Sequence, residues 1–270
     1  MAEPMAGGGP IGVEAEFGPL RTVGVALAVC GVCALLLTGS VVLLRPYQIQ
    51  NQQDSSEARV HELVSDLPGV GALIAEAGEA QLDLRAVELA TGVFAPSVDP
   101  MDLLEGGDGG AESTPLPAER DPAGIGRVPR YAPVHLLYRA GSLHTVILPV
   151  SGRGYGGAIR GYLALAGDGD TVRGITFVDH RETPGLGAEI ESADWQARWR
   201  GKRLRDAGGA VRIRTVELAP DPNSPDSVYE IQGISGATRT SRGVAELVRF
   251  WVGPDGFGPL LTRLRAGEDA

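Results

Sequence analysis

Positive charge is scarce in this sequence. The 24 Lys and Arg residues are outnumbered by 34 Asp and Glu residues, which gives a formal net charge of −10 and an isoelectric point near 4.9. Nucleic acid is therefore excluded as a partner, because phosphate backbones are bound by basic surfaces. Much of the acidity is local: from Asp99 to Asp121 seven acidic residues accompany the single Arg120, a net charge of 1 − 7 = −6.

Cysteine is nearly absent. Cys30 and Cys33 have the spacing of a metal or redox pair, but both lie inside a long apolar run. Two thiols cannot complete a tetrahedral metal site, so we interpret them as small hydrophobic residues of a helix. A cluster shared with another subunit is the alternative. Because no cysteine occurs outside the run, the rest of the chain gives no indication of its redox compartment.

Hydrophobic residues are plentiful, and the longest apolar run predicts a membrane helix. The 270 residues are 43% hydrophobic, which is enough to bury a core. After an N-terminal tail, 1–21, residues 22–44 carry no charge along 23 positions. Such a helix is roughly 34 Å long and crosses a hydrocarbon layer of about 30 Å. The run is longer than a signal-peptide core, so we expect an uncleaved anchor. Arg21 and Arg45 balance and leave its orientation open.

Two further regions precede the main domain. Residues 45–95 predict a helical stretch: one helix ends at Pro68, and a second runs from Ala72 to about Leu89. Residues 96–129 are acidic and rich in Gly and Pro, with too little apolar content to become ordered, which predicts a linker or loop.

Residues 130–265 predict an α+β domain with an antiparallel sheet and flanking helices. Short apolar runs alternate with turn-forming residues, which is typical of strands joined by hairpins. Val244, Leu247, Val248 and Trp251 mark one face of a helix. The predicted strands are 134–138, 144–150, 161–167, 172–178, 211–216 and 228–234.

One candidate site lies between the last strand and that helix, in the segment Ser235, Gly236, Ala237, Thr238, Arg239, Thr240 and Ser241. A glycine turn that enters a helix offers free backbone N–H groups and hydroxyls, which suits a phosphate. Composition alone favours a plainer interpretation, a turn capped by Thr240 or Ser241.

A second candidate segment is His180, Arg181, Glu182, Thr183, Pro184, Gly185, Leu186 and Gly187. Taken alone, its Pro-Gly pair predicts only a turn after a strand. The third segment, 152–157, matches the G-x-G-x-x-G pattern, but a strand follows it within a few residues. Because the dinucleotide fingerprint requires a helix at that point, we exclude a nicotinamide site. No catalytic residue and no metal ligand is predicted.

The SGATRTS segment resembles the flavin-attachment motif of the FMN-binding NqrC subunit of the sodium-translocating NADH:quinone reductase and of the RnfG subunit of the related Rnf complex. The segment 180–187 is similar to a stretch that lies beside the flavin in the same families. The resemblance covers residues 20–95 loosely and 130–265 well, and the Phe-Trp and Gly-Phe-Gly-Pro ending resembles the reductase subunit in particular.

The resemblance implies FMN joined covalently through its phosphate to Thr238 by a separate flavin transferase, which supplies the activating groups. It also implies that Thr183 to Gly187 pack against the isoalloxazine, since small residues allow close approach. His180 and Glu182 are either hydrogen-bonding or purely structural residues, and Tyr155 either touches the ring or packs. The chain departs from the motif at Gln232, where Asp is usual, and at Arg239, where an aliphatic residue is usual.

The function implied is electron transfer through FMN, one electron at a time, inside a membrane complex that oxidises NADH, reduces quinone and exports sodium. Activity belongs to the assembly, because the chain alone has no complete active site. The partners are the other subunits, the transferase and the membrane, and the expected location is the bacterial inner membrane, with one crossing and a periplasmic domain. The alternatives are the Rnf subunit and a non-redox binding module on an anchor.

Overall fold

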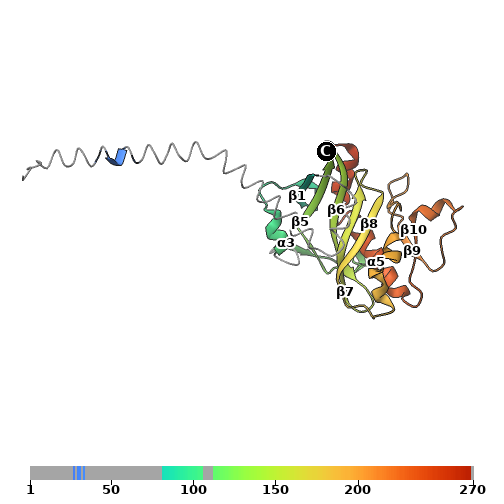
Figure 1. Cartoon of the computed structure of the whole chain (residues 1–270). Helices are drawn as coiled ribbons and strands as arrows, with labels where there is room; N and C mark the ends of the chain where they lie inside the picture. The colour runs from blue at the N-terminus through green and yellow to red at the C-terminus, as the bar shows by residue number, and fades with distance from the viewer. Residues whose placement is uncertain (1–26, 28, 32, 34–80, 106–111, 269–270) are drawn as a thin grey trace, which may run out of the picture. The chain divides into compact units, whose positions relative to one another are not determined.

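The computed structural model describes residues 27, 29–31, 33, 81–105 and 112–268 (Figure 1). Contacts divide the chain into residues 1–56 and 57–270, and the fold described below belongs to the second unit. The predicted anchor, 22–44, lies mostly outside the described residues, although the five of its residues that are described are helical. The helices formed by described residues include none that is long and apolar enough to cross a membrane. The predicted helix before Pro68 also lies outside the described range.

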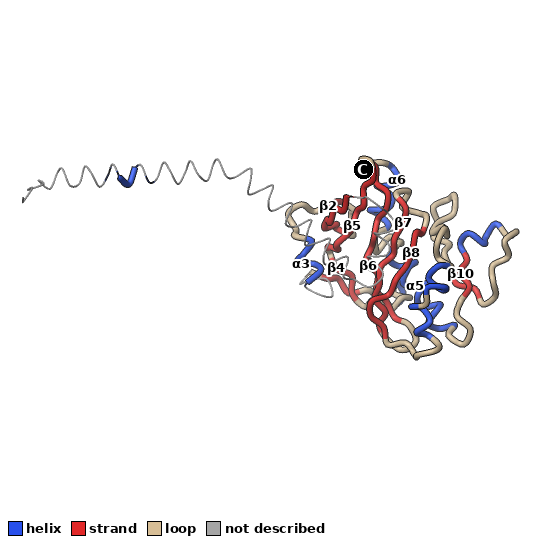
Figure 2. The backbone as a smooth tube through the Cα atoms, viewed as in Figure 1, coloured by secondary structure: helices blue, strands red, loops and turns tan. Residues whose placement is uncertain are grey.

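The domain is built on a six-stranded sheet with the strand order β2-β1-β5-β6-β7-β8, in which every neighbouring pair is antiparallel. Figure 2 shows these strands side by side. The antiparallel sheet predicted for residues 130–180 is confirmed. Its strands are β1 (Gln81–Glu88), β2 (Val93–Phe94), β5 (Tyr131–Arg139), β6 (Ser142–Arg153), β7 (Ala158–Ala166) and β8 (Val172–His180).

The helix predicted up to Leu89 is wrong, because residues 81–88 form strand β1. All eight of its residues pair with β5, from Gln81 opposite Tyr138 to Glu88 opposite Tyr131. Leu, Ala and Glu favour helices intrinsically, but a full-length ladder with a neighbouring strand outweighs that weak preference. The sheet therefore includes residues that precede the predicted domain start at residue 130.

The expectation of an unordered acidic linker is also wrong for the described part of residues 96–129. This part is ordered by polar contacts and by a few apolar side chains, since Ala123 is buried in the core and Leu116, Ile125 and Val128 pack against it. The Asp121 carboxylate accepts hydrogen bonds from the amides of Ile125 and Gly126, at 2.7 and 2.8 Å. Its elements are α3 (Pro100–Glu105), β3 (Ser113–Pro115), the 3-10 helix η1 (Ala118–Arg120) and β4 (Arg127–Pro129), and β3 pairs with β4 antiparallel.

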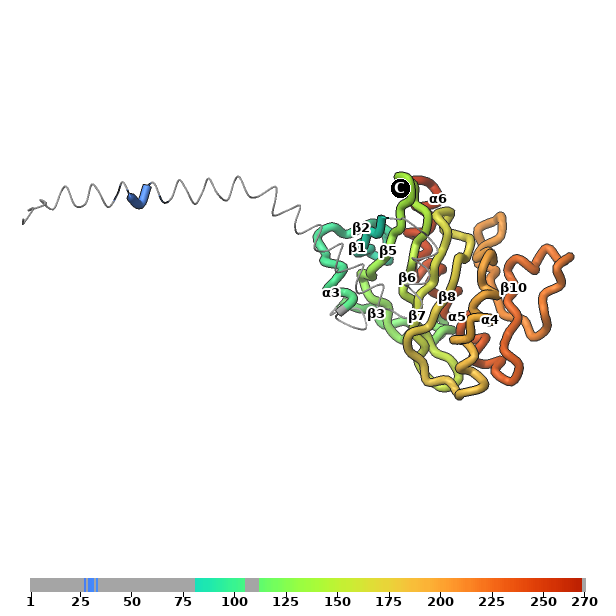
Figure 3. The backbone as a smooth tube through the Cα atoms, viewed as in Figure 1, coloured from blue at the N-terminus to red at the C-terminus, as the bar shows by residue number. Residues whose placement is uncertain are grey.

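The C-terminal elements cover one face of the sheet and include a separate two-stranded sheet. Figure 3 shows residues of about 205–232 as an orange lobe beside β8. Strand pairing in this lobe is shorter than predicted, because the residues before β9 and β10 follow turns and a 3-10 helix instead. The elements are η2 (Gly187–Glu191), α4 (Ala193–Ala197), β9 (Arg214–Val216), η3 (Pro225–Tyr229), β10 (Glu230–Gln232), α5 (Thr238–Trp251) and α6 (Gly258–Ala266), with β9 and β10 parallel.

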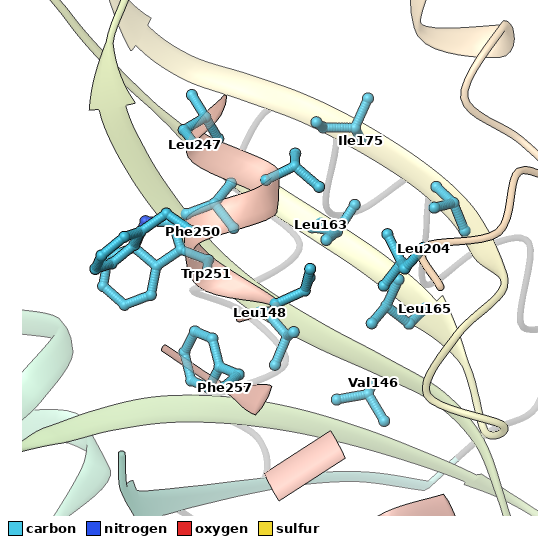
Figure 4. Close-up of a cluster of buried hydrophobic side chains, with 14 of the residues drawn as sticks. Val146, Leu148, Leu163, Leu165, Ile175, Leu204, Leu247, Phe250, Trp251 and Phe257 are labelled. Atoms are coloured by element: carbon cyan, nitrogen blue, oxygen red, sulfur yellow. The ribbon is translucent and has the colours of Figure 1, made fainter. Parts of the chain in front are cut away.

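Helix α5 closes the core against strands β6, β7 and β8. The predicted apolar face is confirmed: Val244, Leu247 and Val248 are fully buried, and Trp251 is 5% exposed. The Trp251 indole N–H donates to the Ser151 carbonyl of β6 at 2.7 Å, which fixes the helix along that strand. Figure 4 shows Leu247 and Trp251 of the helix in one cluster with the sheet residues Val146, Leu148, Leu163, Leu165 and Ile175.

Candidate functional site

The turn before α5 presents Thr238 to solvent at the start of the helix. α5 begins at Thr238, three residues before the predicted start near Ser241, so neither Thr240 nor Ser241 is its N-cap. The cap residue is Ala237, which has no side chain able to cap. Gly236 has φ +76°, a left-handed conformation that favours glycine, and the Ala237 amide donates to the Ile234 carbonyl at 3.0 Å. The Thr238 side chain is exposed, so its hydroxyl is accessible to a modifying enzyme.

Ser241 holds this turn together instead of capping the helix. It is 1% exposed, and its hydroxyl accepts from the Ile234 amide at 2.9 Å and donates to the Ala237 carbonyl at 3.1 Å. The Gly233 amide donates to the Val216 carbonyl at 2.8 Å, continuing the pairing of β10 with β9. We define residues 235–241 as the acceptor turn. Hydrogen bonds of Gly233 just before it and of Ser241 at its end hold this turn in place.

The three segments selected from the sequence meet at the carboxylate of Glu182. This side chain is only 5% exposed. Its Oε1 accepts from the Gly156 amide at 2.8 Å, and its Oε2 accepts from the Thr240 hydroxyl at 2.5 Å. The glycine-rich segment, the segment 180–187 and the acceptor turn are thus joined by one residue.

The glycine-rich segment is a hairpin, as predicted, and not a dinucleotide site. Arg153 ends β6 opposite Ala158, which begins β7, and the Gly154 amide donates to the Gly157 carbonyl at 2.8 Å. A Cβ atom on Gly154 would overlap Glu182 Oε1, and one on Gly156 would overlap the Arg181 carbonyl oxygen. These glycines make room for the buried carboxylate and its loop, and not for a pyrophosphate.

Residues 183–187 form a tight turn against the acceptor turn. The Thr183 carbonyl accepts from the amides of Leu186 and Ala188, each at 3.1 Å. Gly187 is buried, and a Cβ there would lie 2.5 Å from Glu182 Oε2 and 2.7 Å from Thr240 Oγ1. Thr183, Pro184, Gly185 and Leu186 are exposed, and Gly185 has φ +72°.

Two large side chains lie exposed beside the acceptor turn. Tyr155, at the hairpin tip, is 63% exposed, and the Arg239 guanidinium carbon is 5.3 Å from its ring centroid, a cation–π contact. Leu186 is 44% exposed, and its Cδ2 would be 3.2 Å from a Cβ on Gly236. Exposed apolar and aromatic groups around an exposed hydroxyl suit an aromatic ring that would cover them.

Three contacts around the site could not be predicted from the sequence. The Gln232 carbonyl accepts from the Trp195 indole N–H at 3.1 Å, and Arg198 Nη1 lies 3.4 Å from both Gln232 oxygens. His180 Nε2 lies 2.9 Å from Glu191 Oε1, a close contact without hydrogen-bond alignment. The sequence did offer one signal for the buried position of Glu182, namely the glycines at 154, 156 and 187. A side chain at any of these three positions would overlap Glu182 or the backbone next to it.

No cluster of three or more His, Cys, Asp or Glu able to hold a metal occurs among the described residues. Cys30 and Cys33 are free thiols. A cavity of about 540 Å³ lies where β5 and β6 no longer pair, beyond the pair His135 and Ile147. Its lining reaches the candidate segments only at Gly152. Pro133 and Pro149, which lack an N–H donor, line this gap. None of the predicted FMN-binding residues lines it.

Known proteins are similar to this chain over most of its length. The FMN-binding domain family matches residues 154–253, which begin at the glycine hairpin and end just after α5. The NqrC subunit of the Na(+)-translocating NADH-quinone reductase of Pseudomonas aeruginosa is 38% identical over 252 residues, 92% of this chain and 97% of that protein. The chain belongs to this NqrC family. The Pasteurella multocida NqrC subunit is 37% identical over 238 residues, 87% of this chain and 90% of that one.

The fold agrees with the family. The crystal structure of NqrC from Shewanella oneidensis superposes with a TM-score of 0.62 at 25% identity, covering 80% of this chain and 99% of that one. The predicted membership in the NqrC family and its α+β FMN-binding domain are therefore confirmed.

The residues of this NqrC-family chain fit FMN. A hydroxyl stands at a helix N-terminus, where unpaired amides favour a phosphate. Tyr155 and Leu186 offer apolar surface to the ring, and Arg239 brings a positive charge next to Thr238. The bound flavin supplies the electron-transfer chemistry, and the protein binds, orients and tunes it.

Proposed function

We propose that this chain is the electron-carrying NqrC subunit of a Na(+)-translocating NADH-quinone reductase and that its FMN is joined to Thr238 by a phosphoester. The observation that best supports the proposed covalent linkage is the arrangement of the threonine and serine hydroxyls at the start of α5. Thr240 and Ser241 are buried and hydrogen bonded, whereas Thr238 is exposed on the same helical turn.

Attachment needs a donor and an enzyme that the chain does not provide. Thr238 Oγ1 bonds to the FMN phosphorus of flavin adenine dinucleotide while the phosphoanhydride bond breaks and adenosine monophosphate leaves. The hydroxyl proton goes to a base of the flavin transferase, because a threonine hydroxyl is a weak nucleophile without one. Gln232 does not offer the carboxylate usual at its position, and its side chain faces Arg198 instead.

The test is covalent flavin on the denatured full-length chain. Protein co-expressed with the transferase should fluoresce as a flavin band after denaturing electrophoresis, and the tryptic peptide 215–239 should be heavier by FMN less water. Thr238→Ala should abolish both signals. Ser227→Ala, which removes another hydroxyl from the same peptide, should keep them. A fluorescent Thr238→Ala variant would refute attachment at Thr238, and a non-fluorescent wild type would refute covalent FMN.

We also propose that residues 22–44 anchor the chain once in the bacterial inner membrane, with the FMN-binding domain in the periplasm. The apolar length of this run supports the crossing, and the side is the one implied by the resemblance of the motifs. A C-terminal alkaline phosphatase fusion should be active, since that enzyme requires an oxidising compartment. An inactive but stable fusion would place the domain in the cytoplasm.

The rival assignments differ in their partners. As an NqrC subunit, the chain should co-purify with the other reductase subunits, and quinone reduction by NADH should belong to that assembly. Co-purification with Rnf subunits would support the RnfG alternative, and isolation as a flavin-free monomer would support a binding module. The relatives at 37–38% identity favour the reductase.

A further inference from the structure

Glu182 is a buried carboxylate held by neutral hydrogen-bond donors. Asp170, which is similarly buried, lies 2.9 Å from the Arg203 guanidinium. The Glu182 oxygens instead accept from a backbone amide and from a hydroxyl. Burying a carboxylate is costly unless hydrogen bonds compensate, so this pair of contacts requires an explanation.

These two contacts connect parts of the chain that are far apart in sequence. Gly156 is 26 positions before Glu182, and Thr240 is 58 positions after it. The surrounding glycines leave space for the carboxylate and for nothing larger, since a Cβ on Gly187 would be 2.5 Å from Oε2. The pocket around Glu182 is therefore formed for this side chain.

Helix geometry links the Thr240 contact to the orientation of Thr238. Successive residues of an α-helix are about 100° apart, so residues two positions apart point to nearly opposite sides. Thr240 is 2% exposed and held toward the hairpin by Glu182, which directs Thr238 outward. The first turn of α5 has neither a side-chain cap nor an acidic residue of its own. Glu182 supplies the negative charge that a helix N-terminus favours.

We propose that Glu182 is a positioning residue for flavin attachment: it fixes the first turn of α5 so that the Thr238 hydroxyl faces the transferase. This inference rests on the proposed attachment at Thr238. It assigns to Glu182 the orientation of the acceptor and not a contact with the reacting atoms.

The test measures the rate of attachment to the full-length chain, purified in detergent without flavin. Purified transferase and excess flavin adenine dinucleotide are added, and covalent fluorescence is followed over time. Glu182→Gln keeps the side-chain volume but can no longer accept both hydrogen bonds, and it should slow attachment about tenfold, the effect expected for the loss of a charged hydrogen bond. Glu189→Gln, an exposed glutamate on η2, is the matched control and should react at the wild-type rate.

Thr240 variants test whether the effect passes through the same contact. Thr240→Val keeps the shape but loses the hydroxyl and should be as slow as Glu182→Gln, whereas Thr240→Ser should recover most of the rate. The double variant should be no slower than either single one, since residues in one contact are not additive. Additive slowing would overturn the proposal.

Leu247→Ala is the control that separates a positioning role from a general loss of stability. It weakens the packing of α5 on the sheet at a buried position away from the acceptor turn. The two variants are compared under conditions in which their melting temperatures are equal. If Leu247→Ala then slows attachment as much as Glu182→Gln does, the effect of Glu182 is one of general stability and the proposal fails. Equal rates for Glu182→Gln and wild type would also overturn it. Absence of covalent flavin on the wild type would instead refute the proposed function.

Discussion

His135 should make the stability of the domain depend on pH between about 6.5 and 4. The residue lies on β5 and is fully buried, with its ring centroid 6.3 Å from that of Tyr162 and no hydrogen-bond partner for either nitrogen. Burial lowers the pKa of His135 from 6.5 to about 4, and the backbone of Ile147 opposes this shift more weakly.

The sign follows from where each state binds the proton. The unfolded chain protonates His135 near pH 6.5, whereas the folded chain stays neutral until about pH 4. In that window the unfolded state binds more protons, so stability is lost as the pH falls, and it is constant above the window. The pKa difference of 6.5 − 4 = 2.5 corresponds to about 3 kcal/mol, of which about 2 kcal/mol is lost by pH 5.

Urea unfolding of the full-length chain in detergent measures this loss. Its three tryptophans, Trp195, Trp199 and Trp251, are all buried in the domain and report its unfolding by fluorescence. Since other groups also titrate, the quantity to follow is the stability of His135→Leu minus that of wild type. This difference should become more favourable to the variant by about 2 kcal/mol between pH 7.5 and pH 5. If the two stability curves stay parallel, His135 is not buried as a neutral residue.

Three further outcomes are expected. Leu247→Ala should lower the free energy of unfolding by about 2–5 kcal/mol, measured by urea denaturation, because its fully buried side chain leaves a cavity between α5 and the sheet. Gly156→Ala should destabilise the domain by about 1–3 kcal/mol, since its Cβ would overlap the Arg181 carbonyl, while Gly208→Ala, with its nearest neighbour at 3.4 Å, should change the melting temperature little. Arg239→Leu should lower the flavin midpoint potential in a redox titration, because a nearby cation favours the reduced anionic flavin, and Arg239→Lys should keep the potential; equal values for both variants would contradict this role.

The central sheet could be predicted from the sequence because its signals are local. The strands from Tyr131 to His180 are short apolar runs separated by turn residues, and Gly141 and Gly169 adopt positive φ at two of those turns. The apolar face of α5 is likewise readable from its spacing alone. Boundaries are less local: α5 starts at Thr238 because Ser241 bonds back to Ile234, a contact that composition does not reveal.

The errors have a common physical origin in distant partners. Residues 81–88 have a helix-favouring composition, but β5 provides a ladder some fifty residues further along. The composition of residues 96–129 indicates too little apolar content to fold, yet in their described part Asp121 accepts backbone hydrogen bonds and Ala123 packs into the core. The resemblance identified the candidate residues of the site, whereas the convergence of its three segments on Glu182 depends on contacts across 26 and 58 positions.

The bridging role of Glu182 has a consequence for protein engineering. A seven-residue stretch proposed to accept a flavin looks like a portable tag, suitable for insertion into any exposed loop. In this domain, however, the helical start of that stretch is held by a carboxylate from one distant loop and, through it, by the amide of a hairpin. A transplanted heptapeptide would lack that support, so a host scaffold should label efficiently only if it supplies its own buried acceptor for the second threonine.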